Sequence, residues 1–220
     1  MDLIFLGIQG SGKGTQARLL ADQFGLLIFE TGKEFRKIAE QDTALGRQIK
    51  ATIDAGKLVP YDLPPRIAEE FVQQLGPDQR VIFDGVPREI PQAELFWPML
   101  AKYKRDYLLV NFLLTEAEGI RRLTGRLNCP NPQCNAIYPA DEKSATCAKC
   151  GSTLEKRVDD ADLASIKQRM SIFIKQTMPV IEEQKVLGRA IEINAQQSVE
   201  AVYQDLLEAL AARGVISTNQ

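Results

Sequence analysis

The chain has 220 residues, of which 45% are hydrophobic and 25% charged, and its formal net charge is −2. These values are typical of a soluble globular protein, and the lack of a basic excess argues against a general nucleic-acid or membrane-surface binder. The chain has no histidine, which excludes a Ser-His-Asp triad and histidine metal ligands.

Short apolar runs alternate along the chain with segments whose apolar residues recur at helical spacing. The runs predict buried strands, in chain order, at 2–6, 26–29, 80–83, 107–113 and 190–193. The periodic segments predict helices at 13–24, 64–75, 91–103, 116–127, 161 onward with a break at Pro179, and 199–212. Strands that alternate with helices predict an α/β fold, with a parallel five-stranded sheet covered on both faces.

Two segments depart from this alternation. Residues 31–60 are polar and helical, and residues 127–159 are rich in Cys, Pro, Asn, Ser and Lys. We expect both to be inserts in a core domain. The core would then comprise residues 1–30, 61–126 and 160–220.

The strongest motif is the glycine-rich loop between the first predicted strand and the first predicted helix. Glycines let consecutive backbone N–H groups point at phosphate oxygens, the helix N-terminus adds partial positive charge, and Lys13 supplies a cation. The strict form has Ser or Thr directly after the lysine, whereas Gly14 intervenes here. The loop residues expected to bind ATP phosphates are Gly10, Ser11, Gly12, Lys13, Gly14 and Thr15.

This GKGT loop resembles that of the nucleoside monophosphate kinases, and the adenylate kinase family in particular. Three further segments are similar to family motifs, namely Thr31–Arg36 (TGKEFR), Asp54–Val59 (DAGKLV) and Asp84–Arg88 (DGVPR) followed by Ile90–Ala93 (IPQA). The resemblance runs from end to end of the chain. It implies a P-loop core, a helical monophosphate-binding insert at residues 31–60 (the monophosphate insert), a zinc-bearing lid at residues 127–159 (the lid), and phosphoryl transfer from ATP to a nucleoside monophosphate.

The resemblance also implies which monophosphate is accepted. Thr31 and Gln92 would face the acceptor base, and having both favours AMP, because uridylate and cytidylate kinases usually carry Ala and Asn there. Arg36 and Arg88 would clamp the acceptor phosphate, and Asp84, at a strand end, would hold Mg²⁺ through water. The expected AMP-binding residues are Thr31, Gly32, Arg36, Lys57, Leu58, Val59, Gly85, Val86, Pro87, Arg88, Gln92, Arg157 and Arg169.

Cations around the migrating phosphoryl group form the expected catalytic set: Lys13, Arg88, Arg126, Arg157 and Arg169. Besides the loop, the ATP site would include Arg122, Arg126, Ile137, Tyr138 and Gln197, although the histidine that often follows this tyrosine is Pro139 here. Arg122 and Arg126 are expected to share one helix face. The interval from Arg157 to Arg169 is one residue longer than the family pattern. We expect the extra residue in the turn after Asp160; otherwise Lys167 would replace Arg169.

The four cysteines read Cys129-x4-Cys134-x12-Cys147-x2-Cys150. Two such pairs predict a structural Zn²⁺ held by four thiolates, a site that iron or cobalt could also occupy. The alternatives are two disulfides or four free thiols, which the clustering disfavours. A zinc-bearing lid also matches one form of the adenylate kinase family.

The leading hypothesis is a monomeric ATP:AMP phosphotransferase that uses Mg²⁺ and has ATP and AMP or ADP as partners. Met1 to Ile8 lack a basic region and a cleavage site, and no run approaches the roughly 20 apolar residues of a spanning helix. We therefore expect a cytoplasmic protein with no membrane and no nucleic-acid partner. The alternatives are a UMP/CMP kinase, a zinc-ribbon module that uses nucleotide as a switch, and an inactive paralogue.

Overall fold

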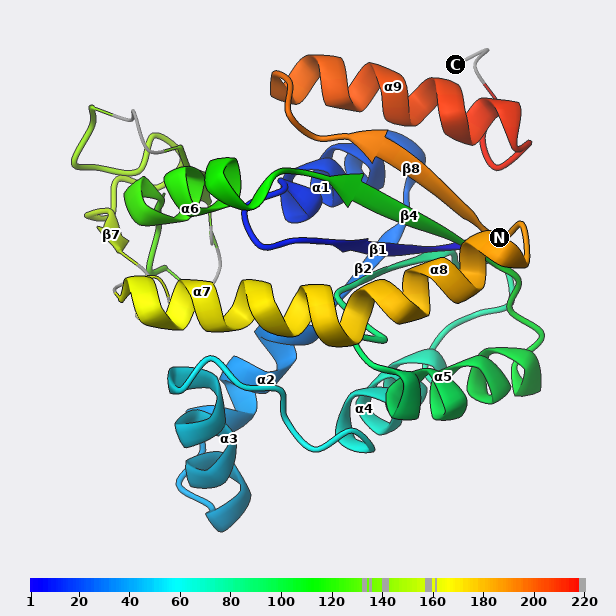
Figure 1. Ribbon diagram of the computed structural model, residues 1–220, viewed down its shortest axis with the longest axis horizontal. Helices are drawn as coiled ribbons and strands as arrows, with labels where there is room; N and C mark the ends of the chain where they lie inside the picture. Colours follow the sequence, from blue (N-terminus) through cyan, green and yellow to red (C-terminus); the bar gives the residue numbers. More distant parts are fainter. Residues whose placement is uncertain (132–133, 135, 140–142, 157–159, 161, 218–220) are drawn as a thin grey trace.

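A computed structural model describes residues 1–131, 134, 136–139, 143–156, 160 and 162–217 (Figure 1). Its centre is a parallel sheet of five strands in the order β2-β3-β1-β4-β8. The strands are β1 (Asp2–Gly7), β2 (Leu27–Glu30), β3 (Val81–Asp84), β4 (Tyr107–Leu113) and β8 (Ala190–Asn194). All five predicted strands are thus present, within one or two residues of the expected bounds.

Apolar side chains alternate along the strands and form one hydrophobic cluster on each face of the sheet. On one face, Leu3 and Phe5 of β1 pack with Leu20 and Leu206, which lie on α1 (Lys13–Phe24) and α9 (Val199–Ala212). On the other face, Ile4 packs with residues of the remaining core helices. These are α4 (Leu63–Val72), α5 (Ile90–Lys102), α6 (Glu116–Gly125), α7 (Leu163–Ile172) and α8 (Met178–Val186). The predicted helix-covered parallel sheet is therefore confirmed.

The predicted break at Pro179 is wrong. The chain turns through a π-helical segment, Phe173–Thr177, and Pro179 then lies in the first turn of α8. Because proline lacks an N–H and its ring clashes with the carbonyl four residues back, the wider π-helical turn directly before Pro179 lets the helix continue through it. The Thr177 hydroxyl donates a 2.7 Å hydrogen bond to the Arg88 carbonyl oxygen, so the π-helical segment contacts the loop that follows β3.

Two inserts extend away from the sheet. The monophosphate insert contains α2 (Thr31–Ala39) and α3 (Ala44–Asp54), which project below the sheet in Figure 1. The lid contains an antiparallel sheet in the order β6-β5-β7, formed by β6 (Ile137–Tyr138), β5 (Leu127–Asn128) and β7 (Glu155–Lys156). Among the described residues, no helix has both the length and the apolar character needed to cross a membrane.

Candidate active site

A cavity of about 760 Å³ lies at the carboxyl ends of the central strands, where open parallel sheets bind ligands. Its walls come from the glycine-rich loop, both inserts, α6 and α7. Lysine and arginine side chains line the cavity from the glycine-rich loop, the monophosphate insert, α6 and α7, whereas Glu30 and Asp84 are the only carboxylates among its described lining residues. The cavity therefore suits a polyanionic ligand.

The glycine-rich loop forms the floor of this cavity beneath the first turn of α1. Gly10 and Gly12 have φ values of 87° and 84°, and a Cβ on Gly10 would lie 3.0 Å from the Gly119 carbonyl oxygen. The Lys13 ammonium donates to the Gly7 carbonyl oxygen at 2.7 Å. Burial lowers the pKa of Lys13 to about 8, against the opposing effect of Asp84. The loop thus holds a desolvated cation against the cavity.

Asp84 ends β3, and its register partner Glu30 ends β2. Burial raises the pKa of Asp84, opposed by Lys13 and reinforced by Glu30. The Glu30 carboxylate accepts a hydrogen bond from Arg18 at 3.2 Å. Glu30 and Arg18 were not among the predicted site residues, although Glu30 directly follows a predicted strand and Arg18 lies one helical turn after Gly14.

The predicted acceptor side contains a buried hydroxyl and a buried amide. Thr31 is 5% exposed, and its Oγ1 has no hydrogen-bond partner among the residues that the structure describes. The Gln92 amide accepts from the Arg88 N–H at 2.9 Å and donates to Glu89 at 2.9 Å. An unpartnered buried hydroxyl costs free energy in the unliganded protein, so Thr31 marks a position where a ligand atom would be stabilising.

Most of the predicted AMP-binding residues come together on this wall. Val86 and Pro87 do not line the cavity, because Val86 is buried in the core, and Arg157 lies outside the described residues. Those that do line it are Thr31, Gly32, Arg36, Lys57, Leu58, Val59, Gly85, Arg88, Gln92 and Arg169.

Two of the predicted catalytic arginines share one buried carboxylate. Arg126 Nε donates to Asp160 at 2.8 Å, and Arg169 donates to the other oxygen at 2.6 Å. The Asp160 side chain is 1% exposed. Asp160 therefore fixes both guanidinium groups on the cavity wall. No spacing pattern in the sequence indicated this role.

The expectation that Arg122 and Arg126 share a helix face is wrong. Helix α6 ends at Gly125, and Arg126 is extended, with φ −64° and ψ 131°. Arg122 donates to Glu118 at 2.8 Å, and together with Arg121 it holds the pKa of Glu118 at about 2. Both Arg122 and Arg126 nevertheless line the cavity, because the chain turns into β5 directly after the helix.

Arg169 lines the cavity, whereas Lys167 is exposed and is absent from the described lining. Helix α7 begins at Leu163, and the Asp162 side chain accepts from the N–H groups of Ala164 and Ser165. The helix thus begins after Asp160. This agrees with the expectation that the additional residue between Arg157 and Arg169 lies in the turn after Asp160.

The predicted ATP-binding residues also gather at the cavity, except Ser11, which is buried and does not line it. Gln197 lies at the rim, where its amide donates to Asp205 at 2.7 Å. The full set of predicted ATP-site residues on the wall is Gly10, Gly12, Lys13, Gly14, Thr15, Arg122, Arg126, Ile137, Tyr138 and Gln197.

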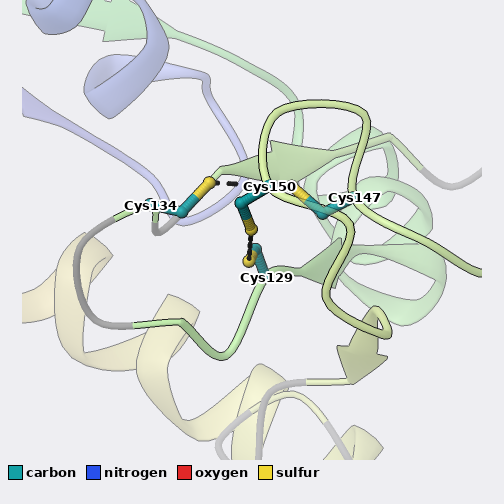
Figure 2. A group of neighbouring side chains, drawn as sticks. All are labelled: Cys129, Cys134, Cys147 and Cys150. Atoms are coloured by element: carbon teal, nitrogen blue, oxygen red, sulfur yellow. Dashed lines mark hydrogen bonds between the residues drawn. The ribbon is translucent and has the colours of Figure 1, made fainter.

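The four cysteines converge within the lid (Figure 2). Their sulfur atoms all lie within 4.8 Å of one another; Cys129 and Cys150 are 3.3 Å apart, and Cys134 and Cys147 are 3.6 Å apart. All four are free cysteines. Thiolates at about 2.3 Å from a tetrahedral Zn²⁺ are separated by about 3.8 Å, whereas a disulfide needs about 2.05 Å. The cluster could therefore hold a metal ion.

A model of the family described as "Adenylate kinase" matches residues 5–188. The chain belongs to the adenylate kinase family.

Curated adenylate kinases match nearly the whole chain. The protein of Geobacillus sp. (strain WCH70) is 36% identical over 218 residues, 96% of this chain and 98% of that protein. The protein of Chlamydia muridarum (strain MoPn / Nigg) is 34% identical over 221 residues, 94% of this chain and 86% of that protein. The protein of Archaeoglobus fulgidus is 32% identical over 211 residues, 94% of this chain and 96% of that protein.

Membership of the adenylate kinase family makes the chain an enzyme, an ATP:AMP phosphotransferase. The resemblance inferred from the sequence is confirmed. The alternatives of a UMP/CMP kinase and a zinc-ribbon binding module are not favoured.

Proposed function

We propose that this enzyme binds ATP on the glycine-rich loop and AMP against the monophosphate insert, with the reacting phosphates between them in one cavity. The observation that carries this proposal is the cation-lined cavity at the strand ends, which combines a phosphate-binding loop with the unpartnered Thr31 hydroxyl. Arg36 and Arg88 would bind the AMP phosphate, and Thr31 with Gln92 would bind its base.

Phosphoryl transfer then follows from alignment and charge. An oxygen of the AMP phosphate attacks the γ-phosphorus of ATP, a new P–O bond forms, and the bond to the β–γ bridging oxygen breaks, giving two ADP. No general base is needed, because the attacking oxygen is already ionised. Lys13, Arg126 and Arg169 would stabilise the charge spread over the equatorial oxygens. Asp160 would keep the two arginines at fixed positions.

Two metal ions fit the donor atoms present. Asp84, partly buried at a strand end close to Lys13, would hold Mg²⁺ through water, and Mg²⁺ would neutralise charge on the ATP phosphates. The four thiols would hold a structural Zn²⁺, because their spacing matches a tetrahedral sulfur site. With every ligand position taken by sulfur, the zinc would stabilise the lid without taking part in transfer.

We also propose that both inserts close over the nucleotides and exclude water, which would otherwise accept the phosphoryl group. Support comes from the cavity wall, to which the monophosphate insert contributes Lys57 and the lid contributes Tyr138. Gly56 lies close enough to α7 that a Cβ there would be 3.0 Å from Ser165 Oγ. The chain would work as a cytoplasmic monomer, with the core and insert boundaries proposed above.

A coupled assay with Mg²⁺, ATP and each monophosphate tests the acceptor assignment. We expect AMP to be phosphorylated with the highest kcat/KM. Substituting Gln92→Asn should lower kcat/KM for AMP more than for CMP, because the shortened amide no longer reaches the adenine edge. A wild-type preference for UMP or CMP would contradict the roles of Thr31 and Gln92.

A further inference from the structure

Tyr138 lies between the cysteine cluster and the nucleotide cavity. Its hydroxyl donates to Cys147 Sγ at 3.2 Å and accepts from the Ala148 N–H at 2.8 Å. The residue packs against the small lid cluster that contains Cys129 and Cys147. Tyr138 also lines the large cavity, together with Ile137. One side chain therefore contacts both sites.

The neighbouring backbone holds Tyr138 in this position. Strand β6 pairs with β5 so that Tyr138 lies opposite Leu127, and the Cys129 N–H donates to the Ala136 carbonyl oxygen at 2.8 Å. Cys147 and Ala148 lie in the loop that carries the second cysteine pair, Cys147 and Cys150, so the Tyr138 hydroxyl joins β6 to that loop. Any ion that fixes the four sulfur atoms also fixes the ring.

A hydroxyl that donates to a metal-bound thiolate stabilises its negative charge and orients the ligand, and loss of such an outer hydrogen bond typically costs 10- to 100-fold in metal affinity. Cys147 is 2% exposed, so water cannot readily replace the tyrosine hydroxyl as a donor.

We propose that Tyr138 couples metal binding at the cysteine cluster to nucleotide binding in the cavity, by holding Cys147 with its hydroxyl while its ring forms part of the nucleotide wall. The inference rests on the metal site proposed above. Coupling of this kind is reciprocal: if the metal raises the affinity for ATP by some factor, ATP raises the affinity for the metal by the same factor.

The test compares the full-length protein with Tyr138→Phe and with the control Tyr203→Phe. Tyr203 also has a bonded hydroxyl, which donates to Gln23 at 2.7 Å, but it lies on α9 and lines neither site. Zn²⁺ affinity is measured under reducing conditions by competition with a chromophoric chelator, with and without ATP. ATP affinity is measured calorimetrically on the zinc-loaded and zinc-free proteins.

We expect Tyr138→Phe to lower Zn²⁺ affinity by about 10- to 100-fold, and Tyr203→Phe to leave it unchanged. In the wild type, zinc removal should weaken ATP binding, and ATP should tighten zinc binding by the same factor. In Tyr138→Phe, that factor should fall toward one.

Three results would overturn the inference. If the loaded wild type contains no zinc, the proposed metal site fails and the coupling fails with it. If zinc is present but Tyr138→Phe binds it as tightly as Tyr203→Phe does, the coupling alone fails and the metal site stands. If wild-type ATP affinity is the same with and without zinc, the coupling is absent whatever the variant's folding stability.

Discussion

The core and the lid are stabilised in different ways. The core buries large side chains on both faces of its sheet, including Phe5, Phe83 and Phe96. Two-residue strands form the lid sheet, around a small apolar cluster that includes two of the four cysteines. A segment with so little buried apolar surface needs a disulfide or a bound metal to hold one conformation. The contrast indicates that the phosphate site depends on hydrophobic packing, whereas the lid depends on its cysteines.

The largest expected effect lies in the core site. Lys13→Ala should lower kcat by at least about 100-fold, because it removes a preorganised cation from the transferring phosphates. The melting temperature should not fall, since the substitution also removes a buried charge whose desolvation lowers its pKa. Lys37→Ala, on the exposed face of α2, is the control. Wild-type kcat in Lys13→Ala would refute the role of the lysine.

The second test asks whether the cysteines hold the lid alone. Cys147→Ser combined with Cys150→Ser should abolish bound metal, as measured by elemental analysis, and make the lid sensitive to protease, while the core unfolds cooperatively. For comparison, Phe96→Ala should destabilise the core by about 3–5 kcal/mol. Unchanged metal content would contradict the proposal that the four thiolates bind the metal. A loss of core stability as large as that of Phe96→Ala would show that the core and the lid are not stabilised separately.

Arg169 and Lys167 provide a matched pair on one helix. Arg169→Ala should lower kcat/KM roughly 10- to 100-fold, because charged hydrogen bonds to a ligand contribute about 1.5–3 kcal/mol. Lys167→Ala should change it by less than about twofold, because exposed charges contribute little. Steady-state kinetics at varied AMP concentration would show which of the two side chains contributes to kcat/KM. The reverse order of effects would move the cation role to Lys167.

The smallest expected effect is a pH dependence of the core site. The pKa of Lys13 is about 8 in the folded protein, so ATP affinity should fall as pH rises through 8 and the ammonium loses its proton. ATP titrations of the wild type and of Lys13→Met from pH 7 to 9 would measure this fall in affinity. If ATP affinity falls over the same pH range in Lys13→Met, the titrating group is not Lys13.

The same pKa affects folding stability. The unfolded chain retains this proton up to the ordinary lysine pKa of about 10.4. Between these values the unfolded state binds more protons, so the lysine's contribution to stability rises with pH.

Long periodic elements were predictable from the sequence, and features set by tertiary contacts were not. The strand at Tyr107–Leu113 and the helix at Val199–Ala212 were predicted to the residue, because their apolar patterns span many positions. The strands of the lid are too short to show alternation. Arg126 was misplaced because the predicted helix was extended past Gly125, a residue that commonly ends helices. Asp160 acquires its importance only through the tertiary contact that brings Arg126 and Arg169 to it.

The π-helical turn at Phe173–Thr177 shifts the helical phase between α7 and α8. An i to i+5 turn accommodates one more residue than an α-helical turn, which rotates the following side chains by about 100° relative to an uninterrupted helix. Arg169 of α7 can therefore face the nucleotide cavity while Ile181 of α8 faces the core. Deleting one residue from this turn would bring the two helices into phase, and one of these two side chains would then point the wrong way.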